Sequence, residues 1–228
     1  MLPYMTPIYI RRERPADYRA SEAVMRDAFW NRYEPGCSEH YLLHVMRSSP
    51  RYVPSLAFVA EAEDRIVGAV AVLASHIETD DGRRLDTLTL GPIGVSPALW
   101  GRGIGRSLLE RVRREAAAGG HRAILLRGDP AFYVRAGYLP AERFGIRTAG
   151  NLYFDALQAC PLRPGALDGA AGRYVEDPIY NVDPQLVAAF DRSFPPWERL
   201  ADTPSQLRFR EMCARMKSGP GASGAPRS

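Results

Sequence analysis

Residues 90–106 decide the fold of this chain: Leu90-Gly91-Pro92-Ile93-Gly94-Val95-Ser96-Pro97-Ala98-Leu99-Trp100-Gly101-Arg102-Gly103-Ile104-Gly105-Arg106. The stretch has the pattern of a strand end, a glycine-rich turn and a helix start. The first amides of a helix have no partner within the helix and carry the positive end of its dipole. Glycines let an anion approach those amides without meeting a Cβ, and Arg102 and Arg106 add positive charge. The stretch therefore predicts a phosphate-binding turn.

Two common phosphate-binding motifs do not fit this turn. A nucleotide-triphosphate loop needs G-x-x-x-x-G-K-[ST], and no Lys-Ser or Lys-Thr stands at that spacing after Gly101. A dinucleotide fingerprint needs G-x-G-x-x-G, and Arg106 stands where the third glycine is required. The region also lacks a βαβ pattern with an acidic residue about 20 residues further on.

A third kind of loop fits. The run from Val95 to Gly105 resembles the acyl-CoA pyrophosphate loop of the GNAT (Gcn5-related) N-acetyltransferase superfamily. A second stretch resembles the second signature of that superfamily, and its Gly-Asp-Pro-x-x-Tyr form is similar to a branch of predicted bacterial acetyltransferases: Leu126-Arg127-Gly128-Asp129-Pro130-Ala131-Phe132-Tyr133-Val134-Arg135-Ala136-Gly137-Tyr138. Residues 35–44 and 190–196 are also similar to that branch, so the resemblance spans roughly residues 8 to 210.

The resemblance implies a fold and a cosubstrate. The fold is α/β (α+β): a mixed, mostly antiparallel sheet with one splayed parallel strand pair and helices on both faces. The cosubstrate is acetyl-CoA. The residues implied to bind it are Ile93, Gly94, Val95, Gly101, Arg102, Gly103, Ile104, Gly105 and Arg106. Trp100 departs from the family pattern, which has Gln or Arg there, and we expect it to pack over the loop or against the adenine.

The implied reaction is direct attack of an amine on the thioester of acetyl-CoA, which requires a base, an oxyanion donor and an acid for the thiolate. By resemblance Tyr133 holds the catalytic tyrosine position and is the expected acid. The oxyanion donor is expected to be a backbone amide between Ile93 and Val95. The same fold also permits a non-catalytic acyl-CoA-binding or sensing protein, and the C-terminal segment could instead dock a partner.

The sequence does not identify a single general base. Glu39 and His40 lie in a predicted helix that starts near Ser38, and they are the two candidates to orient or deprotonate the amine. Other polar side chains could also approach the acceptor: Glu34, His44, Glu78, Asp86 and Thr89. His40 and His44 share a helix face, but a metal site needs a third ligand, so no metal is expected.

Composition narrows the possible cellular location and binding partners of the protein. The chain has 228 residues, a net charge of +4 and three widely spaced cysteines, with Lys217 as its one lysine. It has no apolar run of about 18 residues and no secretory-signal pattern at the N-terminus, so we expect a cytoplasmic protein without a membrane partner. The spread of charge does not predict nucleic-acid binding. We expect a small-molecule or peptide amine as acceptor, and a monomer or homodimer.

The remaining pattern predicts the element order. Strands are expected at residues 8–11, 56–61, 65–73, 85–95, 123–126, 143–146 and 172–175. Helices are expected after Pro15, from 38 to 46, from 104 to Gly119-Gly120, at 183–192 and at 203–216. The predicted organisation is an acetyltransferase domain over 1–180, a helical extension over 181–217 and a disordered tail over 218–228.

Overall fold

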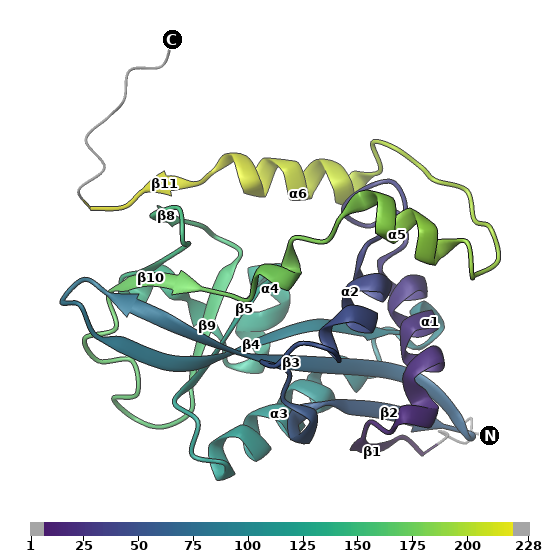
Figure 1. The fold of residues 1–228 in the computed structure, drawn as a ribbon, viewed down its shortest axis with the longest axis horizontal. Helices are drawn as coiled ribbons and strands as arrows, with labels where there is room; N and C mark the ends of the chain where they lie inside the picture. The colour runs from purple at the N-terminus through teal and green to yellow at the C-terminus, as the bar shows by residue number, and fades with distance from the viewer. Residues whose placement is uncertain (1–6, 221–228) are drawn as a thin grey trace.

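In the computed structural model, which describes residues 7–220, the chain folds around one large mixed sheet (Figure 1). Seven strands follow the order β1-β2-β3-β4-β5-β9-β6, while β10 pairs with the far end of β3 and β7 pairs with β10. Adjacent strands are antiparallel except β4 with β5 and β10 with β7. Their bounds are β1 Tyr9–Arg12, β2 Phe58–Ala62, β3 Arg65–Thr79, β4 Arg84–Val95, β5 Ala123–Arg127, β6 Leu139–Pro140, β7 Ile146–Arg147, β9 Leu157–Pro161 and β10 Gly172–Val175.

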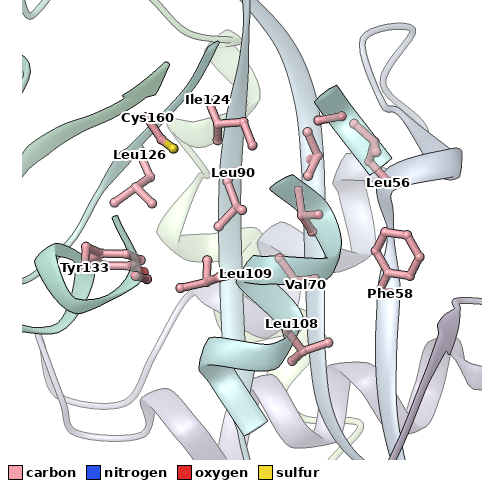
Figure 2. Close-up of a cluster of buried hydrophobic side chains, with 14 of the residues drawn as sticks. Leu56, Phe58, Val70, Leu90, Leu108, Leu109, Ile124, Leu126, Tyr133 and Cys160 are labelled. Atoms are coloured by element: carbon pink, nitrogen blue, oxygen red, sulfur yellow. The ribbon is translucent and has the colours of Figure 1, made fainter. Parts of the chain in front are cut away.

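Helices cover both faces of the sheet (Figure 1). Helix α3 (Ile104–Ala118) lies on one face, and α1 (Tyr18–Phe29) and α2 (Glu39–Met46) lie on the other. The alternation of side chains along β3 serves both layers, because Val70 and Val72 join the α3 cluster while Ala69 and Leu73 join the α1–α2 cluster. Figure 2 shows the α3 cluster, in which Leu108 and Leu109 pack with Leu90, Ile124 and Leu126.

The parallel strands β4 and β5 pair only briefly. Their register joins Leu88 with Ile124 and Thr89 with Leu125, and no further pair follows among residues 7–220. A register shift in the β3–β4 ladder then leaves Gly91 and Pro92 without ladder partners. Proline has no N–H to donate, and Gly91 has a φ of +136° that favours glycine. The predicted separation of this strand pair is confirmed.

Most predicted elements are present, although β3 runs beyond the predicted end at residue 73 to Thr79, and the two-residue strands β6, β8 (Leu152–Tyr153) and β11 (Lys217–Ser218) were not predicted. The helix after the glycine-rich turn ends at Ala118 as predicted, and Gly120 has a φ of +76°. The predicted strand at 143–146 is wrong, because Ala141–Phe144 forms a 3-10 turn and β7 begins at Ile146. The pattern also missed β9, which pairs along the whole of β5.

The C-terminal part of the described chain runs across the α1–α2 side of the sheet (Figure 1). It contains the 3-10 turn η6 (Pro178–Tyr180), α5 (Pro184–Asp191), α6 (Pro204–Ala214) and β11 (Lys217–Ser218), which pairs with β8 (Leu152–Tyr153). Of the predicted tail, Ser218 lies in β11, and residues 221–228 lie outside the described residues. The division into a domain and an extension at residue 180 stays a prediction.

Candidate active site

The glycine-rich turn forms the entry to α3. Gly101 and Gly103 have φ values of +78° and +79°, and Gly103 is the N-cap of the helix. A Cβ on either glycine would meet nothing within 4 Å, so the turn is open on its outer side. Because no side chain caps the helix, the first amides of α3 are available to an anion. Arg102 is exposed beside these amides. Arg106 forms an ion pair with Glu110, with 2.8 Å between Nε and Oε1.

Trp100 packs over this turn. Its indole Nε1 donates a hydrogen bond to the Val95 carbonyl at 2.7 Å, and the guanidinium of Arg32 lies 5.2 Å from its ring centroid. The side chain remains 52% exposed. The indole of Trp100 therefore fixes the turn to the end of β4. The family pattern has a polar side chain at the position of Trp100.

The backbone of β4 offers donors at the edge that faces away from β3. The Ser96 amide donates to the Val67 carbonyl at 2.8 Å, which makes that pair a hydrogen-bonded one. Hydrogen-bonded pairs alternate along an antiparallel ladder, so Gly94 is bonded to β3 while Ile93 and Val95 direct their amides to the opposite edge. That edge is the one from which β5 has separated.

Gly94 has a different function from its neighbours. A Cβ at this position would lie 2.8 Å from Met25 Sδ and 3.1 Å from Ala28 Cβ. The glycine therefore lets α1 pack closely on β4, and the two outward amides of Ile93 and Val95 are the ones available to a ligand.

Tyr133 lies on the β5 side of the separated strand pair. It ends α4 (Pro130–Tyr133), whose N-cap Asp129 accepts a hydrogen bond from the Ala131 amide at 3.0 Å. Its ring packs in the α3 cluster beside Leu126 and Leu109 (Figure 2). Burial raises the pKa of the phenol well above its ordinary value of 10, with nearby Tyr33 adding to the rise. The hydroxyl therefore keeps its proton at neutral pH, as a proton donor requires.

Glu39 is the first residue of α2, on the α1–α2 side of the sheet. It shares a helix face with Leu42, Leu43 and Met46, whose side chains pack on the sheet. Its carboxylate accepts a hydrogen bond from the Ser38 amide at 3.1 Å, and the side chain is half-buried. Burial raises the pKa of Glu39 to about 7, where a carboxylate is a competent base.

His40 lies elsewhere and is fully buried. Its ring packs against Phe190 and Phe194 beneath the C-terminal segment, and its Nε2 lies 3.2 Å from an oxygen of Asp191. Burial lowers the pKa of His40 to about 4. A ring with no exposed surface cannot contact an amine, so we revise the expectation: His40 holds the C-terminal segment on α2.

Four of the five other base candidates contact polar partners, and the fifth, Glu34, is exposed. Asp86 forms an ion pair with Arg84, Glu78 lies 3.8 Å from His76 Nε2, and His44 Nδ1 lies 3.0 Å from Glu22 Oε1. The Thr89 hydroxyl is bonded to the Tyr174 hydroxyl. In the part of the chain that the structure describes, no group of three or more His, Cys, Asp or Glu side chains could hold a metal ion.

Sequence reasoning missed a polar cluster on the α1–α2 side of the strand separation. Tyr180 donates a hydrogen bond to the Gly91 carbonyl at 2.9 Å, and Glu176 forms an ion pair with Arg127 at the end of β5. Burial raises the pKa of Glu176 above its ordinary value, against the lowering effect of Arg127. No local motif marks these residues, because their partners are distant in the sequence.

The comparisons with known proteins agree with this geometry. Residues 54–140 match the family model described as an acetyltransferase (GNAT) domain. The N-acetyltransferase YhbS of Escherichia coli K12 is 26% identical over 163 residues, which cover 72% of this chain and 92% of that protein.

Solved structures show the same fold. The crystal structure of E. coli YhbS in complex with CoA has a TM-score of 0.69 at 25% identity and covers 80% of this chain and 96% of that chain. A GNAT family acetyltransferase from Brucella melitensis, solved with acetyl-CoA, has a TM-score of 0.61 at 24% identity, with coverage of 77% and 99%. Among the helices between residues 7 and 220, none has the length and apolar character needed to span a membrane. From the matched model, these relatives and the separated strand pair beside the glycine-rich turn, we conclude that residues 54–140 form a GNAT acetyltransferase domain and that the protein is an acyltransferase.

Proposed function

We propose that this protein is an acetyl-CoA-dependent N-acetyltransferase that moves the acetyl group directly to an amine. The observation that carries the proposal is the separation of β4 from β5 after Thr89, with the open turn before α3 at one end and Tyr133 beside it. An extended ligand with amide groups can pair with the free edge of β4 as an added strand would. The CoA complexes of the two GNAT relatives support this assignment.

The residues of this chain fit the parts of acetyl-CoA. Free amides at the start of α3 and the exposed Arg102 suit the pyrophosphate. The amides of Ile93 and Val95 suit the pantetheine arm and the oxygen of the thioester. Gly94 and Ile104 act through their place in the fold, since Gly94 admits α1 and Ile104 is buried in the α3 cluster.

The proposed chemistry needs one base and one acid. Glu39 takes a proton from the acceptor ammonium, and the free amine attacks the thioester carbon while β4 amides hold the developing oxyanion. The carbon–sulfur bond then breaks, and Tyr133 donates its proton to the departing thiolate. The proton that remains on the former amine nitrogen leaves to solvent, and the Tyr133 phenolate and the protonated Glu39 return to their starting states by exchange with solvent. The polar side chains of Glu176 and Tyr180 lie on the acceptor side of the same separation. The acceptor is a small-molecule or peptide amine.

A release assay tests this proposal against the non-catalytic alternative. Purified protein with acetyl-CoA and a library of amines should release free CoA thiol in proportion to N-acetylated product, measured by thiol reagent and mass spectrometry. Binding of acetyl-CoA with no amine-dependent thiol release would favour the sensing alternative. We also propose a cytoplasmic location, because Cys37, Cys160 and Cys213 are all free thiols.

A further inference from the structure

The C-terminal helix α6 spans two segments that flank Tyr133. At its start, Thr203 Oγ1 and Gln206 Nε2 both donate hydrogen bonds to the Asn31 carbonyl, at 3.1 and 3.2 Å. Asn31 belongs to the connection between α1 and α2. The helix then passes over α4, and β11 beyond it pairs with β8 (Figure 1). The helix therefore joins the α1–α2 connection to the α4 side of the molecule.

Two side chains in the middle of α6, Arg208 and Phe209, contact segments near Tyr133. The ring of Phe209 lies 4.8 Å from the ring of Tyr33, centroid to centroid. Arg208 forms an ion pair with Asp129, the N-cap of α4, at 2.7 Å. Tyr33 and Asp129 are near enough to Tyr133 for both to affect the pKa of its phenol. The helix thus contacts segments on two sides of the proposed acid.

The attachment of α6 is weak for a helix of eleven residues. Gln206 is its one fully buried side chain, Leu207 is 47% exposed, and Met212 and Cys213 pack partly buried against the cluster that contains Leu125 and Leu157. The Arg208–Asp129 pair is itself largely solvated, with side-chain exposures of 67% and 36%. Such a pair contributes little, and a single aromatic contact adds a modest amount. The contacts of Arg208 and Phe209 are therefore separable from the packing of the sheet.

We propose that residues 203–214 form a strap over the acceptor entrance, held by Arg208 and Phe209, which restricts the acceptor to small amines. This inference rests on the proposed function, because it assigns a substrate class to the same site. A lysine on a folded protein would have to displace the strap, whereas a small amine passes beneath its edge. Arg208 and Phe209 are specificity-determining residues.

The first readout needs no substrate. Cys213 lies on α6 and is partly buried, while Cys37 and Cys160 are buried in the body of the protein. The double variant Arg208→Ala/Phe209→Ala should raise the rate of Cys213 alkylation by iodoacetamide about tenfold, since it removes both contacts. The matched control is Arg210→Ala, because Arg210 pairs with Asp202 within the C-terminal segment. The control should leave the rate unchanged.

The second readout measures acceptor size. Thiol release from acetyl-CoA is followed with 1-aminobutane and with a short peptide that contains one lysine. The wild type should use 1-aminobutane in preference to the peptide, and the double variant should lose that preference while Arg210→Ala keeps it. If the double variant does not fold, Arg208→Ala and Phe209→Leu are measured singly.

Two results would overturn the inference. One is an unchanged Cys213 alkylation rate in the double variant. The other is a wild type that uses the peptide as well as 1-aminobutane. If no amine of the library gives thiol release, the proposed function fails, while the alkylation rates still decide whether Arg208 and Phe209 hold α6 closed.

Discussion

The ring of Tyr133 lies directly against Gly128. A Cβ at position 128 would stand 2.1 Å from Cε2 of that ring and 3.0 Å from its Cζ. The ring also packs edge-on against Phe132 and Tyr138, with centroids 4.9 and 5.7 Å away. The glycine of the Gly-Asp-Pro-x-x-Tyr motif thus provides the space that the proposed acid occupies.

Gly128→Ala should therefore displace Tyr133. We expect the turnover number to fall about as far as it does when the phenol is removed, with a loss of about 1–3 kcal/mol in unfolding free energy from the overpacked ring. The matched control is Gly150→Ala, where a Cβ would meet only Thr148 Oγ1 at 3.8 Å. Steady-state kinetics and urea unfolding measure both effects. Normal turnover in Gly128→Ala would show that the ring position does not matter.

Glu39 predicts an acidic limb in the pH profile. Because burial raises the pKa of Glu39 to about 7, the proposed base is ionised only above that pH. Turnover should fall as the pH drops through 7, and Glu39→Gln should remove this limb and most of the activity. Glu34→Gln is the control, because Glu34 only raises the pKa of Glu39 through its charge. The control should keep the limb and move it to lower pH. An unaltered profile in Glu39→Gln would exclude Glu39 as the base.

The same group predicts a change in stability with the opposite sign. Between the ordinary pKa of 4.5 and the raised value of about 7, the folded chain holds a proton that the unfolded chain has released. Stability therefore falls as the pH rises through this window. Glu39→Gln should raise the melting temperature relative to wild type more at pH 8 than at pH 4.5, as measured by calorimetry. An equal shift at both pH values would contradict the raised pKa.

His40 predicts loss of stability in acid. Burial lowers the pKa of His40 from 6.5 to about 4, so the unfolded chain binds a proton in this window that the folded chain does not. The free energy of unfolding should fall as the pH drops from 6.5 to 4, by up to about 3 kcal/mol from this group. His40→Gln should flatten that slope in urea titrations, whereas His121→Gln, outside the cluster, should not. Normal acetyl transfer per folded molecule in His40→Gln is also expected.

Trp100 predicts a measurable effect on acetyl-CoA affinity. Trp100→Phe keeps an aromatic ring near Arg32 but removes the hydrogen bond to the Val95 carbonyl. Losing one such bond costs about 1 kcal/mol, so the dissociation constant should rise about fivefold in titration calorimetry. Tighter binding in the variant would mean that the indole competes with the ligand for that carbonyl.

Local chemistry explains what the sequence could predict. The turn from Trp100 to Gly105 and the start of α3 follow from Gly101 and Gly103, whose positive φ values favour glycine, so pattern alone located them. The separation after Thr89 was likewise predictable from Pro92, which cannot join a ladder.

Long-range contacts explain what the sequence could not predict. Glu39 and His40 are neighbours, yet one faces the sheet side and the other is covered by Phe190 and Phe194, 150 residues away in the chain. The pairing of Glu176 with Arg127 also joins residues that are distant in the sequence. The missed strand β9 is short and ends in a proline, so its local pattern gives little signal. Helix spacing places Glu39 with Leu42 and Met46, and His40 does not share that face, a signal that distinguishes the two residues in retrospect.

The most direct test of the central claim is the turnover of Tyr133→Phe at saturating acetyl-CoA and amine, measured together with the dissociation constant for acetyl-CoA. The variant keeps the ring on Gly128 and loses only the proton donor. Loss of a general acid should lower the turnover number about a hundredfold or more, with the dissociation constant unchanged. Turnover equal to that of the wild type would contradict the assignment of Tyr133 as the acid that protonates the CoA thiolate.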